Sequence, residues 1–197
     1  MKKLIVFILF CHTLSAQETN ENIDIFRNKG YFNITRFSFT KVNFVEQDIF
    51  IPGQGNFVGK LSDDKAKAFA LETINGYFFS PYFSLGVGFG LDGYHNPNIN
   101  TMPLFLDSRV YLKNGYNSLF AFMDLGLLAK VSDNFTKGSM FNIGAGYKFS
   151  LGEKKRIFLL PELSYSIKSI SLTDEGIKDS DNIVRVRGLR FGLGILF

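Results

Sequence analysis

GLRFGLGILF, residues 188–197, closes the chain and indicates how most of it folds. Side chains alternate between the two faces of a β-strand, so residues of one parity share a face. One parity carries only large apolar residues: Leu189, Phe191, Leu193, Ile195 and Phe197. The other parity carries mostly glycine: Gly188, Arg190, Gly192 and Gly194. A strand of a soluble protein usually shows Lys, Glu, Thr or Gln on its non-apolar face. Glycine in these positions predicts that this face points into a narrow, crowded interior and that the apolar face points toward lipid.

The same alternation recurs in three earlier segments, which begin near Tyr82, Ser118 and Gly138. In the first, Phe83, Leu85, Val87, Phe89 and Leu91 stand opposite Ser84, Gly86, Gly88, Gly90 and Asp92. Bacterial outer-membrane barrels are built from such segments of about ten residues, apolar outside and polar inside, separated by turns. The repetition indicates that these segments are strands of one barrel.

The start of the chain reads as a secretory signal peptide. Lys2 and Lys3 precede an apolar run at residues 4–10, and Ser15 and Ala16 provide the small residues of a cleavage site. The run is too short to span a bilayer as a helix, which needs about 20 residues. We therefore predict a signal peptide at residues 1–16, a polar periplasmic lead-in at 17–29 and a barrel domain at 30–197. Cys11 raises the rival idea of a lipidated cysteine, but bulky Phe10 precedes it.

Cleavage at this place limits the chemistry of the mature chain. Cys11, the only cysteine, would leave with the signal peptide, which excludes disulfides and thiolate metal sites. Lys2 and Lys3 would leave as well, so 20 basic residues remain against 18 acidic ones, a net charge of about +2. This balance is a weak signal for nucleic acid. We predict no nucleic-acid partner, no cofactor and no metal.

Eight strand candidates lie between Tyr31 and Phe197. Their approximate bounds are 31–44, 68–79, 82–94, 101–112, 118–131, 138–151, 156–172 and 183–197. Only helices and closed barrels satisfy every backbone polar group within hydrocarbon. The predicted fold is therefore all-β, an eight-stranded antiparallel up-and-down transmembrane β-barrel. The facing of the first strand is left open, because Phe37 and Phe39 fall on one parity and Ile34, Val42 and Phe44 on the other.

The lengths of the connections predict which end of the barrel faces the periplasm. Short turns at 80–81, 114–117 and 152–155 alternate with longer connections at 45–67, 95–100, 132–137 and 173–182. Both termini would lie beside the short turns, on the periplasmic side. Within the first long connection, the apolar residues 49–51 before Pro52 favour a hairpin extension over a separate contact surface. Pro161 inside a strand candidate predicts a bulge or a local kink.

The inward parity collects charges of both signs. They are Asp92, Asp107, Arg109, Asp124, Lys130, Lys148, Glu162, Lys168 and Arg190, with Glu72 as a possible addition. Eight strands leave an interior that side chains just fill, so we expect these groups to pair in a structural network. A gated or narrow conduction path is the alternative.

Candidates for catalysis are few. His12 would leave with the signal peptide, and His95 stands alone in a loop beside Asp92 and Tyr94. No serine in the sequence forms an evident partnership with it. The pattern Gly86-x-Gly88-x-Gly90 lies within a strand and opens no helix, so it does not predict a phosphate-binding loop.

Taken together, the chain resembles the small eight-stranded outer-membrane β-barrel proteins, in particular a barrel domain common in Bacteroidetes-type bacteria, with OmpA/OmpX-like architecture. The residues that carry the resemblance are 75–77, 80–86 and the terminal alternation ending at Phe197. It implies location in the outer membrane of a Gram-negative bacterium, contact with outer-membrane lipid, and recognition of Phe197 by the barrel-assembly machinery. The resemblance does not identify an activity or an extracellular ligand.

Four hypotheses about function follow. The first, which we favour, is a non-enzymatic outer-membrane barrel with a structural or surface-interaction role. The second is a narrow channel or transporter for small solutes, dependent on Arg109 or Arg190. The third is a lipid-modifying enzyme that uses His95 or a neighbouring loop acid. The fourth is a soluble lipocalin-like barrel, whose large side chains would point inward.

Overall fold

The computed structural model describes residues 28–96, 98–131, 135–151, 156–172 and 181–197. The predicted signal peptide lies outside this part of the chain, as does the predicted lead-in apart from Asn28 and Lys29. Within the described part, no helix is both long enough and apolar enough to cross a membrane.

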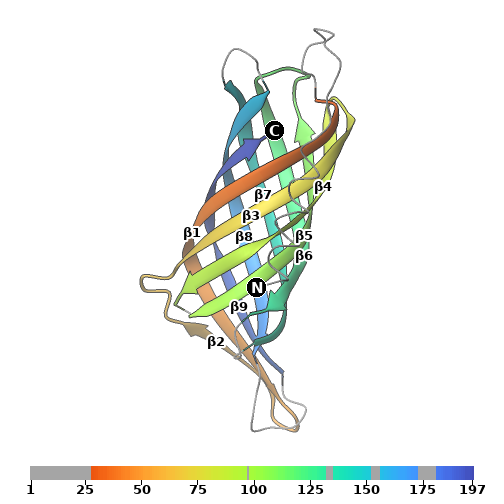
Figure 1. Cartoon of the computed structure of the whole chain (residues 1–197). Helices are drawn as coiled ribbons and strands as arrows, with labels where there is room; N and C mark the ends of the chain where they lie inside the picture. Colours follow the sequence, from red (N-terminus) through yellow and green to blue (C-terminus); the bar gives the residue numbers. More distant parts are fainter. Residues whose placement is uncertain (1–27, 97, 132–134, 152–155, 173–180) are drawn as a thin grey trace, which may run out of the picture.

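Nine antiparallel strands form one sheet in the described part of the chain (Figure 1). They are β1 (Gly30–Ile51), β2 (Gly55–Leu61), β3 (Lys67–Ser80), β4 (Phe83–His95), β5 (Ile99–Tyr111), β6 (Ser118–Lys130), β7 (Phe135–Leu151), β8 (Ile157–Leu172) and β9 (Asp181–Leu196). Each strand from β3 to β9 pairs with the next, β1 pairs with β3, and β1 also pairs with β9. The sheet therefore closes into the predicted eight-stranded barrel, while β2 pairs only with β1.

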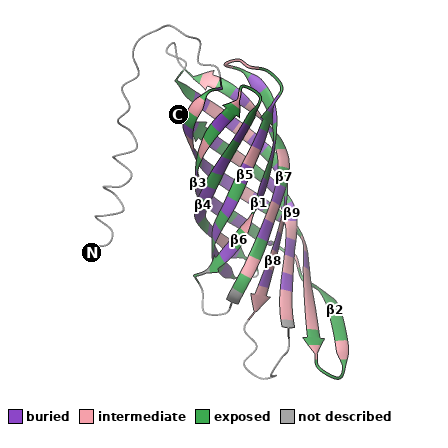
Figure 2. Ribbon diagram, turned by 90° about the vertical axis from the view of Figure 1, so that its right-hand side faces the viewer, coloured by how far each residue is buried: buried purple, intermediate pink, exposed green. Residues whose placement is uncertain are grey.

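Most of the large apolar side chains point away from the barrel axis. Phe83, Leu125, Ile143 and Leu193 are 38%, 56%, 51% and 49% exposed. Residues of the opposite parity are buried, which gives the alternating colours of Figure 2. A soluble barrel of the lipocalin sort would place the large residues inside, so the sequence interpretation of the two faces is confirmed.

A bulge in β1 explains why the facing of this strand was ambiguous. From Ile34 to Val42 the even-numbered residues are buried, and Phe37 is exposed. The register between β1 and β9 then shifts between Val42 and Phe44. One extra residue exchanges the two faces of a strand, so Val45 is buried beyond the shift. Phe44 therefore does not share a face with Ile34 and Val42 although its parity is the same, which resolves the facing that the sequence left open.

Beyond the bulge, β1 continues as part of a hairpin. It runs to Ile51, pairs with β9 as far as Asp181, and pairs with β2 on its other side. Most of the predicted loop at 45–67 is therefore strand, and the hairpin extension is confirmed. We call this end of the barrel the β2 end (at the bottom of Figure 1) and the opposite end, where Gly30 and Phe197 lie, the terminus end.

Two connections predicted to be long are short. β4 reaches His95 and β5 starts at Ile99, while β6 ends at Lys130 and β7 starts at Phe135. Strand pairing continues through polar residues there, which sequence patterning assigned to loops. Long connections at the β2 end thus remain only between β1 and β3 and between β8 and β9.

Pro161 produces no bulge. The β8–β9 register is continuous through the pair Pro161–Leu193. On its other side, pairing with β7 is interrupted between Gly146–Glu162 and Phe149–Leu159, without a change of register. Because proline lacks an N–H group, ladder pairing is lost on one side of β8 only. The predicted bulge was therefore wrong.

The inward glycines make room for aromatic rings from neighbouring strands. A Cβ atom on Gly88 would lie 2.3 Å from Cζ of Phe105, and one on Gly146 would lie 2.5 Å from Cζ of Phe120. Both distances are far below van der Waals contact. Glycine on this face is thus required by the crowding of the interior.

We expect Gly88→Ala to lower the free energy of unfolding by about 1–3 kcal/mol, because the added methyl group overpacks the ring of Phe105. Gly59→Ala in β2 is the control: its Cβ would meet nothing within 4 Å, and about 0.5 kcal/mol or less is expected. Urea unfolding in detergent micelles, followed by gel mobility, compares the two. Equal effects would contradict the crowding argument.

Candidate functional site

Charged side chains meet at one level inside the barrel. Seven of them form a connected set that we call the central ion network: Arg36, Glu72, Asp107, Arg109, Asp124, Glu162 and Arg190. They come from β1, β3, β5, β6, β8 and β9, each from a buried position of its strand. The alternation of the strands is therefore sufficient to direct them all inward.

Arg36 is the hub of the network. Its Nε donates to Oε2 of Glu72 at 2.6 Å, its Nη2 to Oδ2 of Asp124 at 2.8 Å, and its Nη1 to Oε2 of Glu162 at 3.1 Å. The guanidinium carbon lies 5.5 Å and 5.6 Å from the ring centres of Phe105 and Phe122. Only 1% of Arg36 is exposed. Five donors in a fixed plane suit an arginine to join several carboxylates in this way.

Two further arginines extend the network. Arg109 donates to Asp107 at 2.8 Å and to Oε1 of Glu162 at 2.7 Å. Arg190 donates to Glu72 and, through Nε, to Ser38 at 2.9 Å. Glu162 thus joins Arg36 to Arg109, and Glu72 joins Arg36 to Arg190.

Asp107 and Asp124 are direct neighbours across the β5–β6 ladder. Like charges in this position repel each other. Arg109 contacts the first carboxylate and Arg36 the second, while Asn142 donates to Asp124 at 3.0 Å. The arginines therefore allow two carboxylates to share one level of a buried interior.

A second ion pair lies nearer the β2 end. Lys168 donates to Asp92, which also accepts a hydrogen bond from Oγ1 of Thr101 at 3.1 Å. The ammonium nitrogen of Lys168 lies 5.3 Å from the ring centre of Tyr94. Among the contacts of the described residues, none joins this pair to the central ion network.

Lys148 stands apart from both groups. Lys148 donates to Oδ1 of Asn28 and lies 4.8 Å from the ring centre of Phe158, so its partners are an amide and a ring rather than a carboxylate. Asn28 in turn donates to the carbonyl of Pro81 at 2.8 Å. The backbone of Lys130 pairs with Thr101, and its side chain lies outside the described part of the structure.

Arg36 is the residue that sequence reasoning missed. Its signal was available in the alternation of Ile34, Arg36, Ser38 and Thr40 against Phe37 and Phe39. The bulge at residue 43 disguised it, because the apolar residues beyond the bulge follow the other parity. Glu72, named only as an addition, is one of the three carboxylates that Arg36 contacts.

An aromatic layer fills the interior on the terminus side of the network. Phe32, Phe78, Tyr111, Phe120 and Phe122 form a chain of ring contacts with centroid separations of 4.7, 5.5, 5.4 and 6.2 Å. All five are buried. The ion network and this layer together occupy the lumen, as expected for eight strands.

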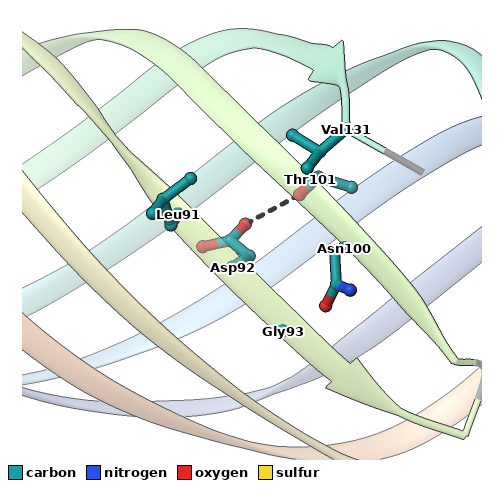
Figure 3. Close-up of a pocket in the computed structure, with 6 residues that line it drawn as sticks. All are labelled: Leu91, Asp92, Gly93, Asn100, Thr101 and Val131. Atoms are coloured by element: carbon teal, nitrogen blue, oxygen red, sulfur yellow. Dashed lines mark hydrogen bonds between the residues drawn. The ribbon is translucent and has the colours of Figure 1, made fainter. Parts of the chain in front are cut away.

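A shallow pocket lies in the barrel wall between β4 and β5 (Figure 3). Leu91, Asp92, Gly93, Asn100, Thr101 and Val131 line it. Asp92 is its only ionisable group, and Lys168 and Thr101 already engage that carboxylate. Both of these hydrogen bonds end on Oδ2 of Asp92, and Oδ1 has no hydrogen-bond partner among the described residues.

His95 is separated from the acids near it in sequence. It is the last residue of β4 and is exposed, whereas Asp92 and Tyr94 have the opposite parity and are buried. The three side chains cannot meet at one reacting atom. Among the described residues, no group of three or more His, Cys, Asp or Glu side chains could hold a metal ion.

Comparison of structures identifies the fold. The outer-membrane protein OprG from Pseudomonas aeruginosa matches with a TM-score of 0.57 at 15% identity, over 88% of this chain and 99% of that chain. The N-terminal β-barrel domain of Pseudomonas aeruginosa OprF gives a TM-score of 0.44 at 15% identity, over 86% and 98%. No protein-family model and no curated protein sequence matches the chain. The likeness establishes the small outer-membrane barrel fold.

Removal of the hub arginine tests the network. Arg36→Met is expected to lower the free energy of unfolding by about 3–5 kcal/mol, because buried carboxylates lose their partner. Arg185→Met is the control, since its ion pairs with Glu46 and Asp48 are partly exposed and worth about 1 kcal/mol or less. Chemical unfolding in micelles measures both. A loss no larger than that of the control would show that Arg36 is not the hub.

Proposed function

We propose that the chain is an integral outer-membrane barrel with a structural or surface-interaction role, its lumen closed by side chains. One observation carries this proposal: a continuous apolar outer face surrounds an interior of paired charges. Water outside the barrel would favour the reverse arrangement. The exposed face is explained if hydrocarbon surrounds the wall.

The outer face is tall enough to cross a membrane. Every outward residue from Leu119 of β6 to Val131, which directly follows the end of this strand, is apolar and exposed. Twelve residue steps correspond to about 40 Å of strand at about 3.3 Å per residue. At a tilt of about 40° the height is roughly 30 Å, enough for an apolar band of about 25 Å. Polar outward residues on β1 and β3 bond each other: Asn33 donates to Thr73 at 3.0 Å and to Asn75 at 2.9 Å.

The terminus end is assigned to the periplasm and the β2 end to the outside. A cleaved signal peptide before residue 17 would deliver the chain from the periplasmic side. The two longest connections, between β1 and β3 and between β8 and β9, lie at the β2 end, as is typical of the outer side. Phe197 is exposed at the terminus end, and its backbone bonds that of Asn33 at 2.8 and 3.0 Å. This position is accessible to the barrel-assembly machinery, and the Bacteroidetes-type resemblance belongs to the same proposal.

The surface-interaction role rests on the extension formed by β2 and the neighbouring parts of β1 and β9. Phe57, Val58 and Leu61 of β2 are exposed large apolar residues beyond the barrel wall. β2 pairs with β1 along one edge only, so its other edge presents backbone donors and acceptors. An edge of this kind can receive a strand from a partner.

Membrane fractionation tests the location. We expect the protein in the outer-membrane fraction, and we expect unboiled samples to migrate differently from boiled ones on a gel, because a closed barrel resists detergent. Recovery in the soluble periplasmic fraction, monodisperse without detergent, would refute the proposal.

Planar-bilayer recording separates the structural role from conduction. The reconstituted protein is expected to give no steady conductance, since the central ion network and the aromatic layer occupy the lumen. A steady conductance that Arg109→Gln or Arg190→Gln alters would instead establish a channel.

A further inference from the structure

Two lysines and a histidine form a row across neighbouring strands on the outer wall. Lys41 of β1 is the direct partner of Lys67 of β3, and Lys67 is the direct partner of His95 of β4. All three side chains are exposed. Side chains directly opposite each other across a ladder are separated by about 5 Å at Cβ, and like charges in such positions repel.

Among the described residues, no carboxylate forms an ion pair with Lys41, Lys67 or His95. Glu46 and Asp48 pair with Arg185, and Asp63 pairs with Lys60. The two lysines of the row therefore have no ion-pair partner in the described part of the chain.

Two more cations lie beside the row, around one ring. Lys60 of β2 and Arg187 of β9 approach Phe44 with their charged groups 5.4 Å and 5.3 Å from the ring centre. Cation–π contacts of this kind hold the charged groups in place. We call Lys41, Lys60, Lys67, His95 and Arg187 the rim cation cluster.

The height of the cluster matches the edge of the membrane. Lys41 lies two positions after Phe39 in β1, and Lys67 lies two positions before Phe69 in the antiparallel strand β3. The rings of Phe39 and Phe69 contact each other, with their centres 5.3 Å apart. The outward apolar face thus ends where the lysines begin. Around the barrel, on β6 to β8, Lys137 is the only exposed lysine or arginine at this end among residues whose side chains are described.

We propose that the rim cation cluster binds the phosphate groups of an outer-leaflet glycolipid of the lipid A type. This inference rests on the proposed orientation, because only then does the cluster lie at the headgroups of the outer leaflet. Phosphate oxygens would accept from Lys41, Lys67 and His95, while the acyl chains would lie along Phe39 and Phe69. The glycolipid supplies both the phosphate groups and the acyl chains, whereas free phosphate supplies no acyl chains.

Lipid binding in neutral-detergent micelles, measured by native mass spectrometry, tests the site. Against bisphosphorylated lipid A, Lys41→Gln/Lys67→Gln is expected to bind at least about tenfold more weakly than the unmodified chain. The control Lys113→Gln/Lys137→Gln removes the same charge at the terminus end and on β7, and a change below about twofold is expected. Monophosphorylated lipid A should bind more weakly than the bisphosphorylated form, and excess inorganic phosphate should displace little lipid.

A failure of the lipid-binding proposal can be distinguished from a failure of the proposed function. All variants are first checked for heat-modifiable migration, which reports the folded barrel and does not require the cluster. Equal lipid affinity of the folded double variant and the control would overturn the headgroup site. Full displacement of lipid by inorganic phosphate would overturn the choice of a glycolipid. A soluble protein without heat-modifiable migration would refute the membrane location itself.

Discussion

The pairing of β1 with β9 is the constraint on which the rest of the structure depends. It joins the first barrel strand to the last, and Asn33 and Phe197 exchange backbone hydrogen bonds where the chain ends. Hydrocarbon offers no partner to a free strand edge, so a lipid-facing sheet is stable only when it closes. Closure also fixes the parity of every strand, and with it the two environments that the side chains occupy.

The interior follows from that closure. Eight strands enclose little space, and rings and charged groups compete for it. Glycine at positions such as 88 and 146 lets aromatic rings from neighbouring strands approach. Arg36 then brings carboxylates from β3, β6 and β8 together, so one buried charge links strands distant in sequence. Such a lumen is suited to rigidity and to blocking passage.

The outer surface of the barrel differs between the side of β1 and the side of β6. β1 carries the bulge, the pairing with β2 and part of the rim cation cluster, whereas β6 presents an uninterrupted apolar row. Because β1 and β9 continue beyond the barrel, cations from the extension and from the wall lie on one side of it. The distinctive features of this barrel are therefore gathered where the sheet is closed.

The sequence by itself determined the outward direction of residues such as Phe83 and Leu193, because period-two alternation is a local property. It also determined the closed barrel and the strand order, because a lipid-facing sheet must close. It also indicated the inward charges from Asp92 to Arg190. Only the tertiary structure decided which of them meet: the hub role of Arg36, the separation of Lys148 from the network, and the row from Lys41 to His95. Those relations depend on the register between strands and on the bulge after Val42, which the pattern of a single strand does not encode.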